Sequence, residues 1–243
     1  MGLFDFFNSK KAIDENYNKW LSLCKQGNYK EAVGWLRKCA EQGDAMAQYN
    51  LGVAYYEGTG LTKDYVQAIK WYNKSAEQGN ADAQFNLAYM YFKGLGTSQD
   101  DKRAAYWYRK SAELGSANAQ CMLGGLYDQG RGVAQDDKQA ADWYFKSAKQ
   151  GYAMAQGNLG MLYAKGRGVK QDFRCAVELF RKSAEQGNAN DQCNLGLMYA
   201  NGQGVPQDFK QALYWFEKSA KQGNVLAQNN IRVLLTQYMG KPL

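Results

Sequence analysis

A near-copy of one segment recurs every 36 residues along the chain. The segment KSAEQGNADAQFNLAYMYFKGLG begins at Lys74, and KSAELGSANAQCMLGGLYDQGRG begins at Lys110. The other copies, the last of them decayed, begin at Lys38, Lys146, Lys182 and Lys218. A fixed period of this length is typical of a solenoid, because one unit is too small to bury its own apolar face and must stack on its neighbours.

Each repeat has the pattern of two helices joined by a loop. Leu87, Tyr91 and Gly94 follow one another at intervals of four and three, which predicts one face of a first helix. The loop GLGTSQD comes next, and an aspartate at its end is placed to cap a second helix. These aspartates are Asp64, Asp100, Asp136, Asp172 and Asp208. Glycine then ends the second helix, as at Gly79 and Gly115, because it accepts the left-handed conformation.

Two kinds of position are expected to build the core. A Trp and Tyr pair, or its replacement, recurs on the predicted buried stripe of the second helix. The pairs are Trp71 and Tyr72, Trp107 and Tyr108, Trp143 and Tyr144, Leu179 and Phe180, and Trp215 and Phe216. One position of the first helix is always small, which predicts close backbone contact between helices; its residues are Gly52, Ala88, Gly124, Gly160 and Gly196. Arg232 takes this position in the last copy and predicts a closing helix with a polar outer side.

The repeat pattern resembles a known family. A-x-x-x-L-G-x-x-Y-x-x-G-x-G-V-x-x-D-x-x-x-A-x-x-W-Y-x-K-S-A-E-x-G is similar to the Sel-one-like repeat (SLR), a relative of the tetratricopeptide repeat with a longer loop. The resemblance covers residues 28–243. It implies an all-α, right-handed superhelical solenoid of antiparallel helix pairs. It also implies an adaptor or scaffold for other proteins, as in many bacterial members.

We therefore predict a single solenoid domain with distinct ends. Residues 1–11 form an N-terminal apolar segment, and residues 12–46 form an atypical tetratricopeptide-like first repeat with a shorter turn. The Sel-one-like repeats are expected at 47–82, 83–118, 119–154, 155–190 and 191–226, and a capping helix at 227–243. Leu3, Phe4, Phe6 and Phe7 of the first segment either cover the open end of the first layer or contact a partner or membrane surface.

Composition excludes several kinds of chemistry. The chain has no histidine, which removes histidine-dependent triads and most transition-metal sites. Its 5 cysteines form no CxxC pair and share no spacing, so we expect no metal site and a reducing cytoplasm. The Gly-x-Gly turns follow helices instead of strands and are interpreted as structural turns, not phosphate loops. We expect no catalytic residue, no cofactor and no enzymatic activity, and the N-terminus has no signal-peptide pattern.

The residues that vary most between repeats lie on the other side of the first helix from Leu87. By the resemblance, this stripe faces the concave groove, where a partner protein or peptide would bind. The candidate residues are Tyr49, Val53, Tyr56, Phe85, Tyr89, Phe92, Asp128, Met161 and Leu197. The first two layers are aromatic and the later layers smaller, so we expect an apolar shelf beside a shallower trough. The alternative is that these aromatic rings pack against the protein itself.

Other functions compete with protein binding. The chain has a net charge of +7, and the lysines on its second helices could bind nucleic acid or an anionic surface. We disfavour nucleic acid because Glu and Asp are interspersed and no exposed aromatic side chain is expected on that face. A third possibility is an inhibitor or immunity-type protein that neutralises an effector. No segment is long and apolar enough to span a membrane, and the residues indicate no particular oligomeric state.

Overall fold

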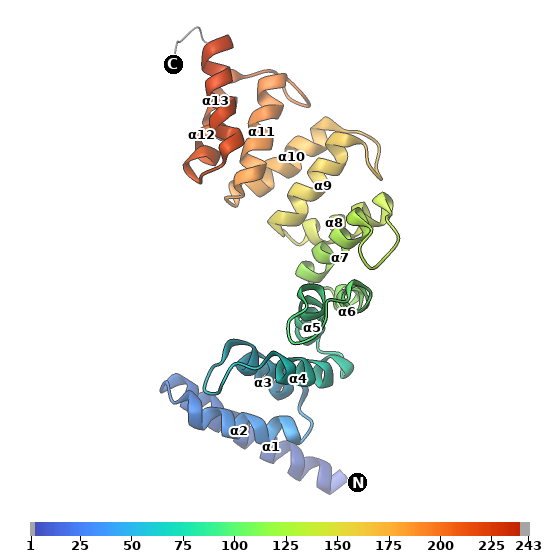
Figure 1. Cartoon of the computed structure of the whole chain (residues 1–243), viewed down its shortest axis with the longest axis vertical. Coiled ribbons are helices and arrows are strands. Elements are labelled where there is room, and N and C mark those ends of the chain that lie inside the picture. The colour runs from blue at the N-terminus through green and yellow to red at the C-terminus, as the bar shows by residue number, and fades with distance from the viewer. Residues whose placement is uncertain (1–2, 239–243) are drawn as a thin grey trace. The chain divides into compact units, whose positions relative to one another are not determined.

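The computed structural model describes residues 3–238, and describes the side chains of residues 14–236. Within this range the chain forms thirteen α-helices and no strand, an all-α repeat solenoid, which confirms the predicted fold class. Figure 1 shows the helices in chain order. They are α1 (Leu3–Lys25), α2 (Tyr29–Glu41), α3 (Ala45–Glu57), α4 (Tyr65–Glu77), α5 (Ala81–Lys93), α6 (Asp101–Glu113), α7 (Ala117–Gln129), α8 (Asp137–Lys149), α9 (Ala153–Lys165), α10 (Phe173–Glu185), α11 (Ala189–Asn201), α12 (Phe209–Lys221) and α13 (Val225–Tyr238).

The chain divides into two compact units. Unit 1 comprises the residues up to Ala119 together with Arg131–Val133, and unit 2 comprises Gln120–Gly130 together with the residues from Ala134 onward. We call α3, α5, α7, α9 and α11 the first helices and α4, α6, α8, α10 and α12 the second helices. In unit 1, each helix from α1 to α6 packs against the next, and the same holds in unit 2 from α8 to α13. That all repeats form a single domain stays a prediction.

The predicted caps of the second helices are confirmed. Asp64 lies in extended conformation before α4, and its Oδ1 accepts hydrogen bonds from the N–H groups of Val66 and Gln67 at 2.9 and 3.0 Å. The other four predicted aspartates cap α6, α8, α10 and α12 through backbone N–H groups of the first turn. At the other end of α4, Gly79 has a φ of +88°, the left-handed conformation that ends a helix. The aspartate and glycine spacing therefore sets the length of each second helix.

The core of each repeat is built around one aromatic ring of the second helix. Tyr72, Tyr108, Phe180 and Phe216 are among the largest fully buried side chains, and Tyr144 is buried as well. Trp71 and Trp215 are also buried, as predicted, whereas Trp107 and Trp143 are only half-buried. The prediction that every pair lies in the core therefore holds for the second ring of each pair. Among the first members it holds for Trp71 and Trp215, whereas Trp107, Trp143 and Leu179 are only half-buried.

The always-small position makes room mainly for a ring. A Cβ built on Gly52 would lie 2.6 Å from Cδ1 of Tyr72, and one on Gly196 would lie 2.6 Å from Cδ1 of Phe216. The Cβ at Gly196 would also lie 3.2 Å from the backbone carbonyl oxygen of Ala212 in the following helix. The small residue therefore accommodates the buried ring of the second helix, and the predicted close backbone contact occurs in addition at Gly196.

The closest approach of two backbones occurs at the Gly-x-Gly turn. The second glycine of the turn after α9, Gly168, has a φ of +67°. A Cβ at Gly168 would overlap the carbonyl group of Asp137, the first residue of α8. The turn of one repeat thus rests directly on the N-terminus of the preceding second helix. Glycine is required there both for its conformation and for space.

Buried glutamines join neighbouring helix ends. The side-chain amide of Gln48 donates to the carbonyl of Ala40 at 3.0 Å, and its Oε1 accepts from the amide of Gln78 at 2.7 Å. The same pair of bonds recurs in unit 2 at Gln192, which donates to Ala184 and accepts from Gln222. Each such glutamine satisfies backbone and side-chain groups that would otherwise be buried without partners.

The two ends of the solenoid differ from the inner repeats. Helix α1 runs without a break across residue 11, and its Tyr17 and Trp20 pack against the core beneath α2 and α3. The side chains of the predicted apolar segment Leu3, Phe4, Phe6 and Phe7 lie outside the described residues. At the other end Arg232 of α13 is exposed as predicted, but so are three apolar side chains of that helix. These are Val225, Leu226 and Val233, so the outer side of α13 mixes exposed apolar residues with polar ones such as Gln228 and Asn229.

None of the helices in the described range combines the length and apolar character that crossing a membrane requires.

Candidate protein-binding surface

The aromatic half of the predicted stripe lies on α3 and α5 of unit 1. Its six residues, Tyr49, Val53, Tyr56, Phe85, Tyr89 and Phe92, are all partly exposed, whereas Leu87 and Tyr91 on the other side of α5 are buried. The helical-wheel division of the first helix into a core side and an accessible side is therefore confirmed in this unit.

Two rings of the stripe pack against the core. The ring of Tyr49 lies 6.0 Å from that of the buried Tyr72, and the ring of Phe85 lies 5.6 Å from that of the buried Tyr108. Burial raises the pKa of Tyr49 above its usual value. These two residues contribute to packing within their own repeats, as the alternative interpretation of the stripe expects.

The other three rings are held by cations. Nζ of Lys93 lies 5.5 Å from the ring centre of Phe92 and 6.0 Å from that of Tyr89. Lys63 lies 6.0 Å from the ring centre of Tyr56. Lys63 also lies 5.3 Å from the ring centre of Tyr65, the first residue of α4, whose ring lies 5.4 Å from that of Tyr56. We call Tyr56, Tyr65, Tyr89 and Phe92, with Lys63, Lys93 and Arg131, the aromatic–cation cluster. Burial, and after it the electrostatic effect of Tyr89, raises the pKa of the Tyr56 hydroxyl above its usual value.

Arg131 is the best-anchored cation of this cluster. Its guanidinium carbon lies 4.2 Å from the ring centre of Phe92, and the same group donates two hydrogen bonds to Asp101, at 2.9 and 3.1 Å. The hydrogen bonds from Arg131 hold the pKa of the Asp101 carboxyl below its usual range. Because Asp101 fixes the fork of the guanidinium, the Phe92 ring is covered on one face by a rigid planar cation.

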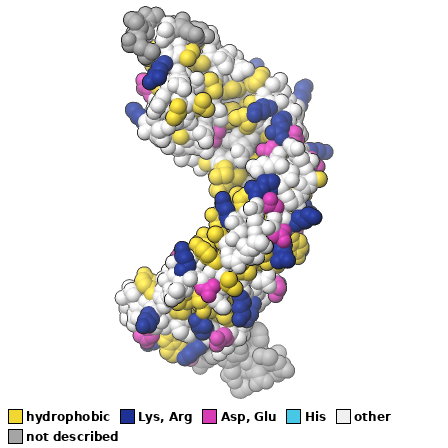
Figure 2. Space-filling model, in the orientation of Figure 1, with side chains coloured by type: hydrophobic (Ala, Val, Ile, Leu, Met, Phe, Trp, Pro, Cys, Tyr) yellow, Lys and Arg dark blue, Asp and Glu magenta, His cyan; other side chains and the backbone are white. Residues whose placement is uncertain are grey.

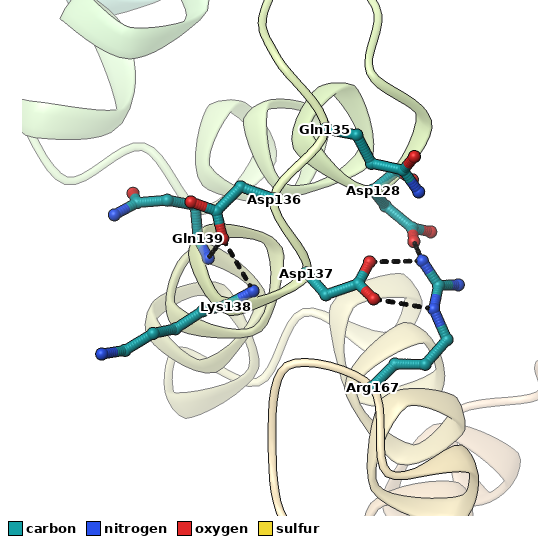
Figure 3. Close-up of polar contacts among 7 residues, drawn as sticks. All are labelled: Asp128, Gln135, Asp136, Asp137, Lys138, Gln139 and Arg167. Atoms are coloured by element: carbon teal, nitrogen blue, oxygen red, sulfur yellow. Dashed lines mark hydrogen bonds and ion pairs between the residues drawn. The ribbon is translucent and has the colours of Figure 1, made fainter.

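Unit 2 uses the same register with different chemistry. Arg167 occupies the middle of its Gly-x-Gly turn, as Arg131 does, but the residue it reaches is Asp128 instead of a phenylalanine. Figure 3 shows the Arg167 guanidinium between Asp128 and Asp137, with a bond of 2.8 Å to Asp128 and two bonds to Asp137. The predicted site residue Asp128 is therefore already bound within the protein.

The remaining predicted site residues do not extend the aromatic surface. Val53 lines a separate hollow of about 190 Å³ together with Trp20 and Cys24 of α1. Met161 packs at the edge of the core around Phe180, and Leu197 is 36% exposed. Their part in binding stays a prediction.

Sequence reasoning missed the cations of the cluster. Lys63, Lys93 and Arg131 lie in the Gly-x-Gly loops or at the helix end that precedes one of them, outside the first-helix stripe. The sequence does indicate that such cations are near, because each loop begins directly after a first helix and its side chains therefore lie close to the aromatic residues at the end of that helix. Only the three-dimensional path of the loop shows which ring each cation covers.

The lysine-rich face of the second helices also carries exposed rings. Tyr106 is 54% exposed with Lys110 at 5.8 Å from its ring centre, and Tyr214 is 47% exposed with Lys218 at 4.7 Å. The expectation that this face lacks exposed aromatic side chains is wrong. Even so, Figure 2 shows Lys and Arg scattered among acidic and neutral side chains on the face in view, without one continuous basic patch.

One buried charge lies outside these surfaces. Asp191 of α11 is 5% exposed, at a position where the other repeats have alanine. Its Oδ2 accepts a hydrogen bond of 2.6 Å from Ser183, and burial raises the pKa of its carboxyl. Gly157 faces it, and a side chain there would overlap the carboxylate. The pair of substitutions, Asp for Ala and Gly for a larger residue, is therefore mutually compensating.

The described side chains also include possible metal ligands and thiols. Among the side chains that the structure describes, no group of three or more Cys, Asp or Glu residues could hold a metal ion. All five cysteines are free thiols, and three of them, Cys39, Cys121 and Cys193, are buried.

The fold and this surface define a helical-repeat solenoid protein. The Sel1 repeat model matches residues 21–44, 45–80, 81–116, 117–152, 153–188 and 189–224, and the chain therefore belongs to the Sel1 repeat family. This confirms the resemblance seen in the sequence; each full repeat begins two residues before the boundary expected there. Proteins of this family are generally scaffolds for protein interactions.

Solved structures with the same fold come from bacteria. The chain is 37% identical to c5321, a protective antigen of uropathogenic Escherichia coli, with a TM-score of 0.85 over 95% of this chain and 50% of that one. It thus spans about half the length of that antigen. A Sel1 repeat protein from Oxalobacter formigenes is 36% identical, with a TM-score of 0.83 over 93% of this chain and 91% of that one. These matches are consistent with a bacterial origin.

A more distant likeness shows the fold alone. The immunity protein PA5088 from Pseudomonas aeruginosa is 22% identical, with a TM-score of 0.52 over 96% of this chain and 88% of that one. No curated protein matches the chain significantly.

Proposed function

We propose that the protein is a non-catalytic adaptor that binds a segment of another protein on the first-helix face of unit 1, over Tyr56, Tyr89 and Phe92. The observation that carries the proposal is the aromatic–cation cluster. Its rings are partly exposed, and Lys63, Lys93 and Arg131 lie against them. Aromatic and arginine side chains dominate binding hot spots, because they bury a large area at a low cost in side-chain entropy.

The size of the surface sets the strength of binding. Each of the three rings exposes less than about a third of its roughly 200 Å², so covering all of them completely gives at most about 5 kcal/mol at about 25 cal/mol per Å². Association costs about 4–15 kcal/mol, so the rings alone support weak binding at most. The cations must therefore take part, and a partner segment with acidic residues beside its apolar ones fits the cluster best.

The proposal is tested by capture of the partner from the native host. The variant Tyr56→Ala with Phe92→Ala removes two rings of the cluster and is expected to lose the partner. A matched control, Tyr106→Ala with Tyr214→Ala, removes two exposed rings from the second helices and is expected to keep it. If the first variant is as well folded as the parent protein and captures the same partner in the same yield, the proposal fails.

The absence of catalysis and a cytoplasmic location belong to the same proposal. The first rests on the lack of histidine in the sequence. The second rests on five free cysteines, which a reducing compartment would keep as thiols. A specific form of the proposal is that the partner is an effector that the protein neutralises, and the captured partner would decide this.

A second candidate function is binding of nucleic acid or another anionic surface. It is favoured by the exposed Tyr106 and Tyr214 beside Lys110 and Lys218, since a ring next to a cation can stack a base. Binding of this kind falls steeply with salt and would be insensitive to Phe85→Ala, which lies on the first-helix face. Retention of single-stranded DNA on the protein above moderate salt, or its loss on Phe85→Ala, would contradict it.

A further inference from the structure

One repeat of unit 2 lacks the aromatic residue that the others carry on the second helix. Tryptophan stands at this position in α2, α4, α6, α8 and α12, but α10 has Leu179. In α4 the equivalent ring, Trp71, is 5% exposed and packs against Leu36, Ala40 and Leu51 of the preceding helices. Leucine is shorter and narrower than tryptophan, so the corresponding space in unit 2 is incompletely filled.

The space left beside Leu179 is a hollow of about 430 Å³. Its apolar wall comes from Ala148, Leu159, Tyr163, Cys175 and Leu179, and Phe145, 56% exposed, continues this apolar surface outward. Ala148 and Leu159 stand at the same register as Ala40 and Leu51 beside Trp71. The volume falls within the range of about 300–1,000 Å³ that is typical of pockets that bind ligands. The hollow thus coincides with the place that the missing tryptophan would occupy.

The rim of the hollow identifies what fits it. A lysine follows the aromatic position by three residues in every repeat, and in α2, α4, α8 and α12 its ammonium lies over the ring at that position, whereas Lys110 of α6 lies over the neighbouring Tyr106. The distances from Nζ to the ring centre are 4.0 Å for Lys38 and Trp35, 4.4 Å for Lys74 and Trp71, 3.8 Å for Lys146 and Trp143, and 5.1 Å for Lys218 and Trp215. Lys182 is the equivalent lysine of α10, and no ring lies beneath it among the side chains that the structure describes.

We propose that this hollow binds an aromatic side chain, of tryptophan or tyrosine size, presented by an acidic segment of another protein. The incoming ring would occupy the missing position beneath Lys182 and receive the cation contact that the other repeats make internally. The segment is acidic because Lys149 and Lys182 both line the hollow and neither forms an ion pair within the described residues, while Glu178 is the one carboxylate there.

This site is separate from the aromatic–cation cluster of unit 1 and does not depend on it. It would give the adaptor a second point of attachment, in unit 2 between α8, α9 and α10. Two weak sites on one chain raise the overall affinity for a partner that reaches both.

The test uses the whole chain and N-acetyl-tryptophanamide as the probe. We expect saturable upfield ring-current shifts of the Leu159 and Leu179 methyl groups in NMR spectra, and N-acetyl-leucinamide at the same concentration should not displace the tryptophan probe. Leu179→Trp supplies the ring internally, so Leu159 should then no longer respond. Leu179→Met keeps the hollow apolar and open, and should retain the response of Leu159.

The charge requirement has its own measurement. A tripeptide Asp-Trp-Asp with blocked ends is expected to bind about three- to tenfold more tightly than Lys-Trp-Lys at low salt, from two exposed charge contacts. Displacement of the tryptophan probe by an equal concentration of N-acetyl-leucinamide, or a Leu159 response that persists in Leu179→Trp, would overturn the proposal. So would concentration-dependent dimerisation that Leu179→Trp abolishes, since the occupant would then be a second copy of this chain.

Discussion

A hydrogen bond between two glutamine side chains recurs from repeat to repeat but is missing in one repeat of unit 1, where a leucine replaces the donor. Restoring the glutamine there should stabilise the protein. Gln78, Gln150, Gln186 and Gln222 each donate from the side-chain amide to the Oε1 of a buried glutamine at the start of a first helix. Leu114 stands at this position after α6 and is 58% exposed. A glutamine at this position would donate to Gln84, whose Oε1 is buried without a hydrogen-bond partner.

The variant Leu114→Gln is therefore expected to restore two bonds. The first joins its amide to Gln84 Oε1, and the second joins it to the carbonyl of Gly79, as Gln78 bonds to Gly43 at 3.0 Å. Satisfying a buried acceptor recovers about 1–3 kcal/mol, and the second bond adds about 0.5–1 kcal/mol. Ordering the glutamine side chain costs up to about 2 kcal/mol of conformational entropy. The expected net gain is about 1 kcal/mol, which corresponds to about 2–4 °C in Tm.

Urea and thermal unfolding, followed by circular dichroism, measure this gain. The reverse change in the same unit, Gln78→Leu, should lower stability by a similar amount because it leaves Gln48 Oε1 without its donor. In a Gln84→Met background the acceptor is gone, so Leu114→Gln should give little or no gain. A Leu114→Gln protein that is no more stable than the parent, or one that gains equally in both backgrounds, would refute the reasoning.

Three further predictions concern other parts of the chain. Gly168→Ala should lower the free energy of unfolding by about 3 kcal/mol or more, because a residue in the left-handed conformation gains a Cβ that overlaps a backbone carbonyl. Gly187 is also left-handed, but a Cβ there would lie in open space, so Gly187→Ala should cost about 1 kcal/mol in the same urea titration. Burial raises the pKa of the Asp191 carboxyl, so the contribution of this group to the free energy of unfolding is fully present below the unfolded pKa and is lost as the pH rises through the folded pKa. Asp191→Asn should therefore raise Tm at pH 7.5 relative to the parent protein. A gain in Tm that does not shrink as the pH is lowered to about 4 would contradict this. Arg131→Ala uncovers Phe92 and frees Asp101, so partner capture should fall while far-UV circular dichroism is unchanged, whereas Arg103→Ala, which removes an exposed cation of α6, should leave capture as it is.

Much of the fold follows from the period of the sequence. The caps at Asp64 and its equivalents, the helix end at Gly79 and the buried side of α5 were all predictable, because each depends on residues a few positions apart. The length of a repeat then fixes which positions stack. The resemblance to the Sel-one-like family pointed to the same arrangement.

Contacts between repeats were harder to predict. Arg131 reaches both Asp101 and Phe92, which lie 30 and 39 residues earlier, because the loop folds back onto the preceding repeat. A one-dimensional pattern shows that the loop is repeated but not where its side chains point. The reason for the small residue at Gly52 was missed for the same cause, since the ring that needs the space comes from the following helix.

The accessible side of the first helices was predicted from the sequence, and its part in binding a partner stays a prediction. The helical wheel found the rings of α3 and α5 but treated them as one shelf, whereas Tyr49 and Phe85 support the core and the other three are held by cations. Departures from the repeat gave further information. Leu179 replaces the tryptophan, and Leu114 the glutamine, that the other repeats carry at the equivalent position. The structure shows a hollow beside Leu179 and, near Leu114, a buried acceptor of Gln84 without a donor.

Site-specific photo-crosslinking tests most directly whether the first-helix face of unit 1 binds a partner. A benzophenone side chain placed at Tyr89, in the aromatic–cation cluster, is predicted to form a covalent adduct with another protein in the native host. The same group at Tyr106, which is 54% exposed on a second helix of the same unit, should form no such adduct with that partner. Equal adducts from both positions, or an adduct from Tyr106 alone, would contradict the account.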